Sequence, residues 1–165
     1  VQCRDVEFRR VNPSRGIKVT VPGPVTMAEQ VQNDDYPDRA TLAMDYAVAV
    51  HQEVTDLFAA GADVVQLDEP WLQAHADDAK EFGVAAINKA LEGVSGTTGL
   101  HLCFGYAAVV KNKASEYAFL AELEGSAVDL VSTEAAQPNL DLSAFAKPPS
   151  QPLVRCDIEP EASAV

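Results

Sequence analysis

The chain has 165 residues, of which 47% are hydrophobic and 22% are charged; this suits one domain and excludes a long disordered or fibrous protein. Its 12 Lys and Arg residues against 25 Asp and Glu residues give a net charge of −13, which disfavours binding to nucleic acid or to an anionic membrane surface. We therefore expect a single domain over residues 1–165, with a frayed tail at 157–165.

The first third of the chain predicts a strand, a short helix and a long helix. β-Branched residues at 17–21 predict the strand. Thr26, followed by Glu29 three residues later, fits the capping box that begins a helix. Apolar residues recur at three- and four-residue steps over 37–60, which predicts a long helix with Gly61 as its C-terminal cap.

The remainder of the chain alternates in the same way. Further strands are predicted at 62–67, 99–104, 128–133 and 153–156, and further helices at 77–91 and 117–124. Such alternation produces right-handed βαβ units around a parallel sheet, so the fold class is α/β. A closed eight-fold barrel needs ~250 residues, so these four to five units predict either an open sheet or a partial (β/α)8 barrel.

The cysteines and the hydropathy indicate a cytoplasmic protein. The three cysteines lie far apart in the sequence and form no disulfide framework, which is typical of a reducing compartment. No apolar run approaches the ~20 residues that span a bilayer, so no membrane partner is expected.

Polar side chains recur where three successive predicted strands end. Asp68 and Glu69 follow the second strand, His101 and Cys103 lie on the third, and Glu134 follows the fourth. The working residues of parallel α/β proteins gather at this carboxyl edge of the sheet. We therefore expect these side chains to share one site.

Two of these residues suggest a metal site. His101 and Cys103 are two apart on a strand, so both side chains point to one face. An imidazole beside a thiolate favours Zn²⁺ over Mg²⁺ or Ca²⁺, and Glu134 is the candidate third ligand through oxygen. The alternatives are a buried cysteine near a hydrogen-bonded histidine, and a surface glutamate at the start of a loop.

The acidic pair before Pro70 is the candidate substrate site. Asp68 is expected to point into the site, where it binds a substrate ammonium or acts as an acid or base, with Glu69 beside it. The alternative is a turn with two solvated acids, because Pro70 ends strands in any case. Trp71 is either one wall of the pocket or simply part of the core.

Four motifs together resemble the C-terminal barrel of the cobalamin-independent methionine synthases. They are GPVT at 23–26, QLDEP at 66–70, HLC at 101–103 and STE at 132–134, in the order and approximate spacing of that family. The resemblance covers roughly residues 18–142 and is stronger to the shorter single-barrel relatives. The same superfamily includes the epoxyalkane:coenzyme M transferases and, more distantly, uroporphyrinogen decarboxylase.

The resemblance implies a fold and a set of site residues. It implies a (β/α)8 barrel of which this chain supplies the third to sixth strands. It implies a zinc ion held by His101, Cys103 and Glu134, and an aspartate, Asp68, that contacts the amino group of homocysteine. The family's last zinc ligand is a cysteine near the final strand, and Cys156 lies too early in the chain to match it.

The resemblance also implies a function. It implies zinc-dependent transfer of a methyl or alkyl group to a small thiol, with homocysteine methylation in methionine biosynthesis as the leading activity. The alternatives are addition of a thiol to an epoxide, and a truncated, non-catalytic barrel fragment that dimerises to cover open sheet edges. The net charge of −13 argues against a polyglutamylated folate as the methyl donor.

Overall fold

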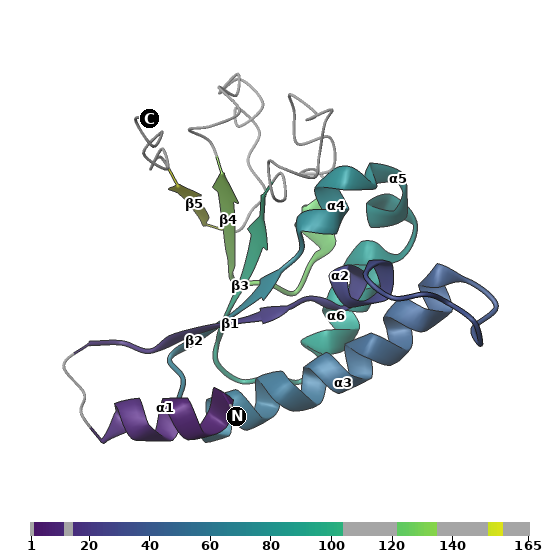
Figure 1. The fold of residues 1–165 in the computed structure, drawn as a ribbon. Helices are drawn as coiled ribbons and strands as arrows, with labels where there is room; N and C mark the ends of the chain where they lie inside the picture. The colour runs from purple at the N-terminus through teal and green to yellow at the C-terminus, as the bar shows by residue number, and fades with distance from the viewer. Residues whose placement is uncertain (1, 12–14, 104–121, 135–151, 157–165) are drawn as a thin grey trace, which may run out of the picture.

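A computed structural model describes residues 2–11, 15–103, 122–134 and 152–156 (Figure 1). The strands form one sheet in the order β1-β2-β3-β4-β5, and every neighbouring pair is parallel. Their bounds are β1 (Lys18–Pro22), β2 (Val64–Asp68), β3 (Thr97–Leu102), β4 (Leu130–Glu134) and β5 (Leu153–Cys156). The prediction of an α/β fold with a parallel sheet is therefore confirmed.

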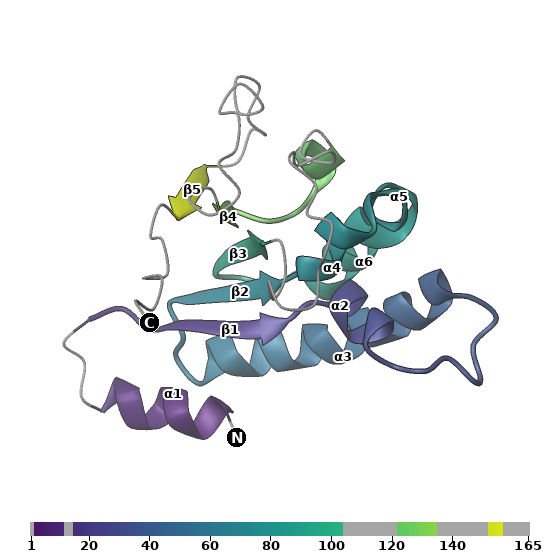
Figure 2. The same ribbon diagram turned by 45° about the horizontal axis from the view of Figure 1, so that its top comes forward.

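The helices occupy the connections between the strands. They are α1 (Gln2–Arg10), α2 (Pro24–Glu29), α3 (Arg39–Ala59), α4 (Pro70–Ala74), α5 (Ala76–Asp78), the π-helical turn η1 (Ala79–Gly83), α6 (Val84–Ala90) and the 3₁₀ turn η2 (Glu122–Gly125). Figures 1 and 2 show α2, α3 and α6 grouped on the same side of the strands. Among the described residues, none of these helices combines the length and apolar character needed to cross a membrane.

One hydrophobic core joins the sheet to these helices. Small alanines on the helices let α3 and α6 approach the large aliphatic side chains of the strands closely. The strand members are Val21, Val65, Leu67, Leu100, Leu102 and Val131, and the helix members are Ala43, Ala47, Val54, Leu57, Ala86, Ile87 and Ala90. Because side chains alternate along a strand, this packing assigns the odd-numbered strand residues of β1 and β2 and the even-numbered ones of β3 to the helices. The residues between them face the other side of the sheet.

The long helix follows its sequence prediction closely. Residues 37–60 were expected to be helical, and α3 spans Arg39–Ala59. The helix begins after Asp38 and not at Pro37, because the Asp38 carboxylate accepts a hydrogen bond from the backbone N–H of Thr41 at 2.7 Å. Gly61 ends it with a φ of 104°, which confirms the predicted glycine cap.

The capping box predicted at Thr26 is wrong. Helix α2 begins three residues earlier, with Pro24 as its first residue and Gly23 as the N-cap. The Thr26 side chain is therefore inside the helix, where its hydroxyl makes a contact described below. The Glu29 carboxylate does not bond to the N-cap residue, and its Oε1 atom lies 3.8 Å from Nε of Arg39.

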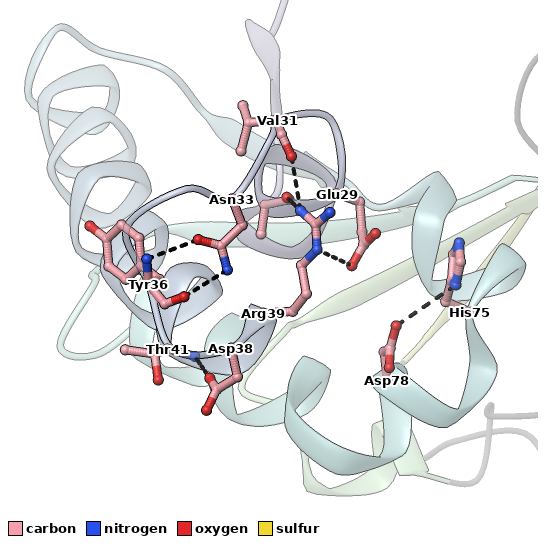
Figure 3. Close-up of polar contacts among 10 residues, drawn as sticks. Glu29, Val31, Asn33, Tyr36, Asp38, Arg39, Thr41, His75 and Asp78 are labelled. Atoms are coloured by element: carbon pink, nitrogen blue, oxygen red, sulfur yellow. Dashed lines mark hydrogen bonds and ion pairs between the residues drawn. The ribbon is translucent and has the colours of Figure 1, made fainter.

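The loop between α2 and α3 is held by polar contacts (Figure 3). The Arg39 guanidinium donates to the carbonyl oxygens of Ala28 and Val31, which closes the C-terminal end of α2. Asn33 accepts a hydrogen bond from the backbone N–H of Tyr36 at 2.9 Å and donates to the Tyr36 carbonyl at 3.1 Å. These contacts fix where α2 lies relative to α3.

Other segments differ from their predictions. The helix expected at 77–91 is a run of α5, η1 and α6, in which a π-helical turn interrupts the regular pattern. Helices α1 and α4 were not predicted. Of the helix expected at 117–124, only the last three residues lie in the described part of the chain, where they belong to η2. The predicted tail at 157–165 lies outside the described residues.

Candidate functional site

The carboxyl edge of the sheet brings the predicted site residues into one row. The Cα register pairs Pro22 with Asp68, Asp68 with His101, and His101 with Ser132. Register partners on parallel strands point to the same face and lie about 4.8 Å apart from strand to strand. Asp68, His101 and Ser132 therefore line the face opposite to Leu67, whose side chain packs towards the helices.

The Asp68 carboxylate is oriented by a hydrogen bond from Gln66, two residues earlier on β2. The Gln66 amide donates to Asp68 Oδ1 at 2.7 Å, and Gln66 itself is buried on the same face of β2. Gly99, on the neighbouring strand, has no side chain, and a Cβ built there would lie 3.6 Å from the Gln66 side chain. The Gln66 side chain therefore packs beside β3 at ordinary van der Waals distance. Asp68 is half-buried, so its carboxylate lies at the rim of the face and not in the core.

His101 lies on β3 and Cys103 follows its last residue, Leu102, so this strand ends two residues before the predicted end at 104. Both residues are half-buried, and His101 Nδ1 lies 3.1 Å from the hydroxyl oxygen of Ser132. This contact occupies Nδ1, so Nε2 is the ring nitrogen that a metal would take. An imidazole and a thiol two residues apart at one strand end are a donor set that suits zinc. The residues present thus fit the metal that the resemblance implies.

The third expected ligand is placed only by its backbone. Glu134 is the last residue of β4, and the register pairs it with Cys156, the last residue of β5. Both positions therefore lie at the same edge of the sheet as His101. Their side chains lie outside what the structure describes. Within the described residues, no three His, Cys, Asp or Glu side chains come close enough to hold a metal.

Glu69 lies away from the row, although it was expected to bind substrate next to Asp68. Its side chain is fully buried and points towards α2. Its two carboxylate oxygens accept hydrogen bonds from the backbone N–H groups of Val25 and Thr26 at 2.9 and 2.8 Å, and from the Thr26 hydroxyl at 2.6 Å. Burial raises the pKa of Glu69 to about 7, against the lowering effect of these three hydrogen bonds. The carboxylate is therefore occupied inside the protein, and substrate binding by Glu69 stays a prediction.

The residues after Pro70 form a short aromatic stack. Trp71 on α4 is half-buried, and its ring lies 5.3 Å from the ring of His75 at an interplanar angle of 29°. His75 Nδ1 lies 3.8 Å from Asp78 Oδ2 (Figure 3). Trp71 is therefore not fully buried in the core, because its ring is half-buried and partly covered by His75.

Sequence reasoning did not identify Gln66, Ser132 or Thr26 as site residues. The first two lie on the same strand face as Asp68 and His101, so spacing by two residues and strand alignment are the signals that find them. Thr26 carries no local signal for its contact with Glu69, because that contact joins residues 43 apart in the sequence.

Sequence comparisons find a matching family model and related proteins. The model of the family described as "Cobalamin-independent synthase, Catalytic domain" matches residues 1–146. A methionine synthase from Saccharolobus islandicus is 35% identical over 113 residues, which are 68% of this chain and 31% of that protein. One from Saccharolobus solfataricus is 37% identical over 97 residues, 59% of this chain and 29% of that protein. The chain thus spans about a third of the length of these relatives.

Solved structures show the same arrangement of strands and helices. A B12-independent methionine synthase from Shewanella sp. W3-18-1, solved in complex with selenomethionine, superposes with a TM-score of 0.83 at 28% identity and covers 94% of this chain and 48% of that one. A methyltransferase from Methanosarcina mazei has a TM-score of 0.65 at 18% identity, over 81% of this chain and 41% of that one, and shows the fold alone. These likenesses are consistent with a partial (β/α)8 barrel.

Proposed function

The chain belongs to the cobalamin-independent synthase family, and from this membership we propose that it carries part of the site of a zinc-dependent transferase that methylates homocysteine. The observation that supports the proposal most is the row at the carboxyl edge, where Asp68 and His101 are register partners. A group that binds an ammonium and a group that binds a metal then lie side by side. An amino thiol needs both at once.

Each residue of the row has a distinct role in this proposal. Asp68, which is oriented by Gln66, binds the ammonium of homocysteine, so that the thiol of this substrate points towards His101. His101 through Nε2, Cys103 and Glu134 would hold the zinc. When bound, zinc supplies positive charge that favours the thiolate of a substrate whose pKa is otherwise about 8.5. The thiolate sulfur then attacks the methyl carbon of the donor, and the bond between the donor and that methyl group breaks.

Metal analysis of the purified full chain tests the zinc site. We expect about one zinc per chain in the wild type, and loss of that zinc in His101→Ala and Cys103→Ser, since a catalytic zinc has only three protein ligands. His51→Ala and Cys3→Ser are the matched controls, because His51 contacts the Ala90 carbonyl on α6 and Cys3 lies on α1. Cys156→Ser, measured in parallel, reports whether that residue contributes to zinc affinity.

The outcome separates the metal site from the reaction. Zinc in the wild type that disappears only in the site variants supports the site. A wild type without zinc, or a His101→Ala variant that retains it, contradicts the proposed metal centre. Methyl transfer to homocysteine, assayed with monoglutamyl and triglutamyl methyltetrahydrofolate, then tests the activity and the expectation that the longer anionic donor gives no advantage.

A further inference from the structure

We infer that Glu69 is a positioning residue, whose buried carboxylate fastens the first turn of α2 to the end of β2 and thereby sets the direction in which Asp68 faces the substrate. The inference rests on the proposed function, because it takes Asp68 as the group that binds the substrate ammonium. It assigns Glu69 a role through Asp68 and not a contact with substrate.

The Glu69 carboxylate accepts hydrogen bonds from the backbone N–H groups at the start of α2. The first N–H groups of a helix have no partners within the helix, and Gly23, the N-cap residue, has no side chain to cap them. Glu69, which directly follows β2, replaces that cap by accepting from the N–H groups of Thr26 and Val25, which lie 43 and 44 residues away in the sequence. The Thr26 hydroxyl adds a third, short hydrogen bond to the same carboxylate.

The approach between the turn and Glu69 is close enough to demand glycine at position 23. A Cβ built on Gly23 would overlap the Oε1, Cδ and Cγ atoms of Glu69. The Gly23 N–H also donates to the carbonyl oxygen of Asp68 at 2.9 Å. The turn therefore holds both the backbone of Asp68 and the side chain of Glu69.

The peptide between Asp68 and Glu69 is fixed on both of its sides. The N–H of Gly23, which follows β1, donates to the Asp68 carbonyl, and the Glu69 N–H donates to the carbonyl of His101 on β3 at 3.0 Å. Because this peptide joins Asp68 directly to Glu69, a backbone rotation that releases Glu69 from α2 also turns Asp68 away from the row. The Asp68 side chain also accepts a hydrogen bond from Gln66.

The environment of Glu69 is costly for a purely structural group. The carboxylate is fully buried, and burial raises its pKa to about 7. Buried ionisable groups add little net stability compared with apolar side chains of similar size, and their best attested use is to specify one arrangement. A group that specifies the arrangement of the turn and of Asp68 fits this environment.

The experiment compares two thiol acceptors in full-length variants. We expect Thr26→Val and Glu69→Gln to raise the KM for homocysteine roughly tenfold, the range for removing a partner from a buried polar group. The KM for 4-mercaptobutanoate, which lacks the amino group, should not change, and kcat and zinc content should stay near wild type. Thr26→Ser, which keeps the hydroxyl, should restore the homocysteine KM.

Leu57→Ala is the matched control for a general loss of stability. Leu57 is fully buried on α3, so its truncation lowers stability without touching the turn. Homocysteine binding by calorimetry is measured alongside. Equal KM values in the wild type and in Thr26→Val, or KM values that rise equally for both thiols, overturn the inference alone. A wild type that neither binds nor methylates homocysteine overturns the proposed function and the inference with it.

Discussion

Asp68 and Glu69 are adjacent carboxylates with opposite surroundings. Asp68 stands half-buried at the end of a strand, with one oxygen held by Gln66. Glu69 is enclosed between the sheet and α2, with both oxygens engaged. Asp68 ends β2 and Glu69 is the N-cap residue of α4, so the chain leaves the strand between them and the two carboxylates lie in different environments.

The raised pKa of Glu69 predicts a pH dependence of stability. The folded state holds this proton up to a pH of about 7, whereas the unfolded chain releases it near 4.5. Between these values the folded state binds more protons, so the free energy of unfolding falls as pH rises. The contribution is complete below pH 4.5 and lost above about 7, and a shift of this size corresponds to about 3 kcal/mol. Glu69→Gln removes it.

Urea unfolding at pH 5 and at pH 7.5 measures this difference. Wild type should lose more free energy of unfolding between these pH values than Glu69→Gln does. Exposed acids with lowered pKa values, such as Asp38 and Asp63, act in the opposite direction but equally in both proteins, so they cancel in the comparison. Identical pH slopes in the two proteins would contradict the prediction.

At this scale the sequence identifies the ends of strands but not the partners of buried side chains. Asp68 and His101 could be placed in one row because parallel strands end at one edge, and the register bears out that placement of their backbones. The environment of Glu69 could not be predicted, because two acids before a proline read equally well as a solvated turn. Its partners lie on an element whose start was itself predicted three residues late.

At the scale of elements, the approach of α2 to β2 predicts a strong effect of one added methyl group. Gly23→Ala should lower the free energy of unfolding by about 3 kcal/mol, the upper range for overpacking a filled interior. Glu69 cannot move aside, because it is fully buried and its carboxylate is held by three hydrogen bonds. Thermal unfolding followed by circular dichroism measures the change.

Gly125→Ala is the matched control for this substitution. A Cβ built on Gly125 meets nothing within 4 Å, and the residue is exposed. Its substitution should therefore leave the unfolding temperature nearly unchanged. If both alanine variants unfold at the wild-type temperature, the turn at Gly23 is not packed as described.

The elements differ in how far their sequences disclose them. Helix α3 was predictable because its apolar face repeats over 21 residues. Helix α1 was not, because only Val6 of its nine mostly polar residues is buried. Helix α4 was hidden by Pro70, which ends strands but also suits the first turn of a helix. Local patterns fail where one residue type serves two structures.

At the scale of the whole chain, the net charge of −13 predicts that salt stabilises the folded state. Like charges repel more strongly in the compact state, and screening at physiological ionic strength shortens their range to about 8 Å. Raising sodium chloride from low to physiological concentration should increase the unfolding temperature by about 3 °C, equivalent to ~1 kcal/mol for a chain of this size. Surface ion pairs such as Lys89 with Glu92 are worth too little to reverse the sign.

A variant with fewer negative charges tests the origin of this effect. Asp35→Asn, Glu81→Gln and Glu124→Gln remove three charges at exposed positions. The triple variant should show a smaller salt-induced increase than the wild type. An unfolding temperature that falls with added salt would contradict the prediction for the whole molecule.

The overall architecture was partly readable from the sequence. Alternating strands and helices were sufficient to predict the parallel sheet, since each crossover returns the chain in the same direction. They could not distinguish an open sheet from part of a barrel, because curvature depends on the packing of whole layers of side chains. The family resemblance favoured part of a barrel, and the superposition on the Shewanella enzyme agrees with it.

The sequential order of the sheet has a consequence for how the protein is made. Within the described part of the chain, each of β1 to β5 pairs only with strands adjacent to it in the sequence. During translation, β1 and β2 can associate before β3 has left the ribosome, since chains emerge and begin to fold from the N-terminal end. The contacts of Gly23 with Asp68 and Glu69 would then form first on the nascent chain. His101 on β3 would pair afterwards with this already formed edge of the sheet.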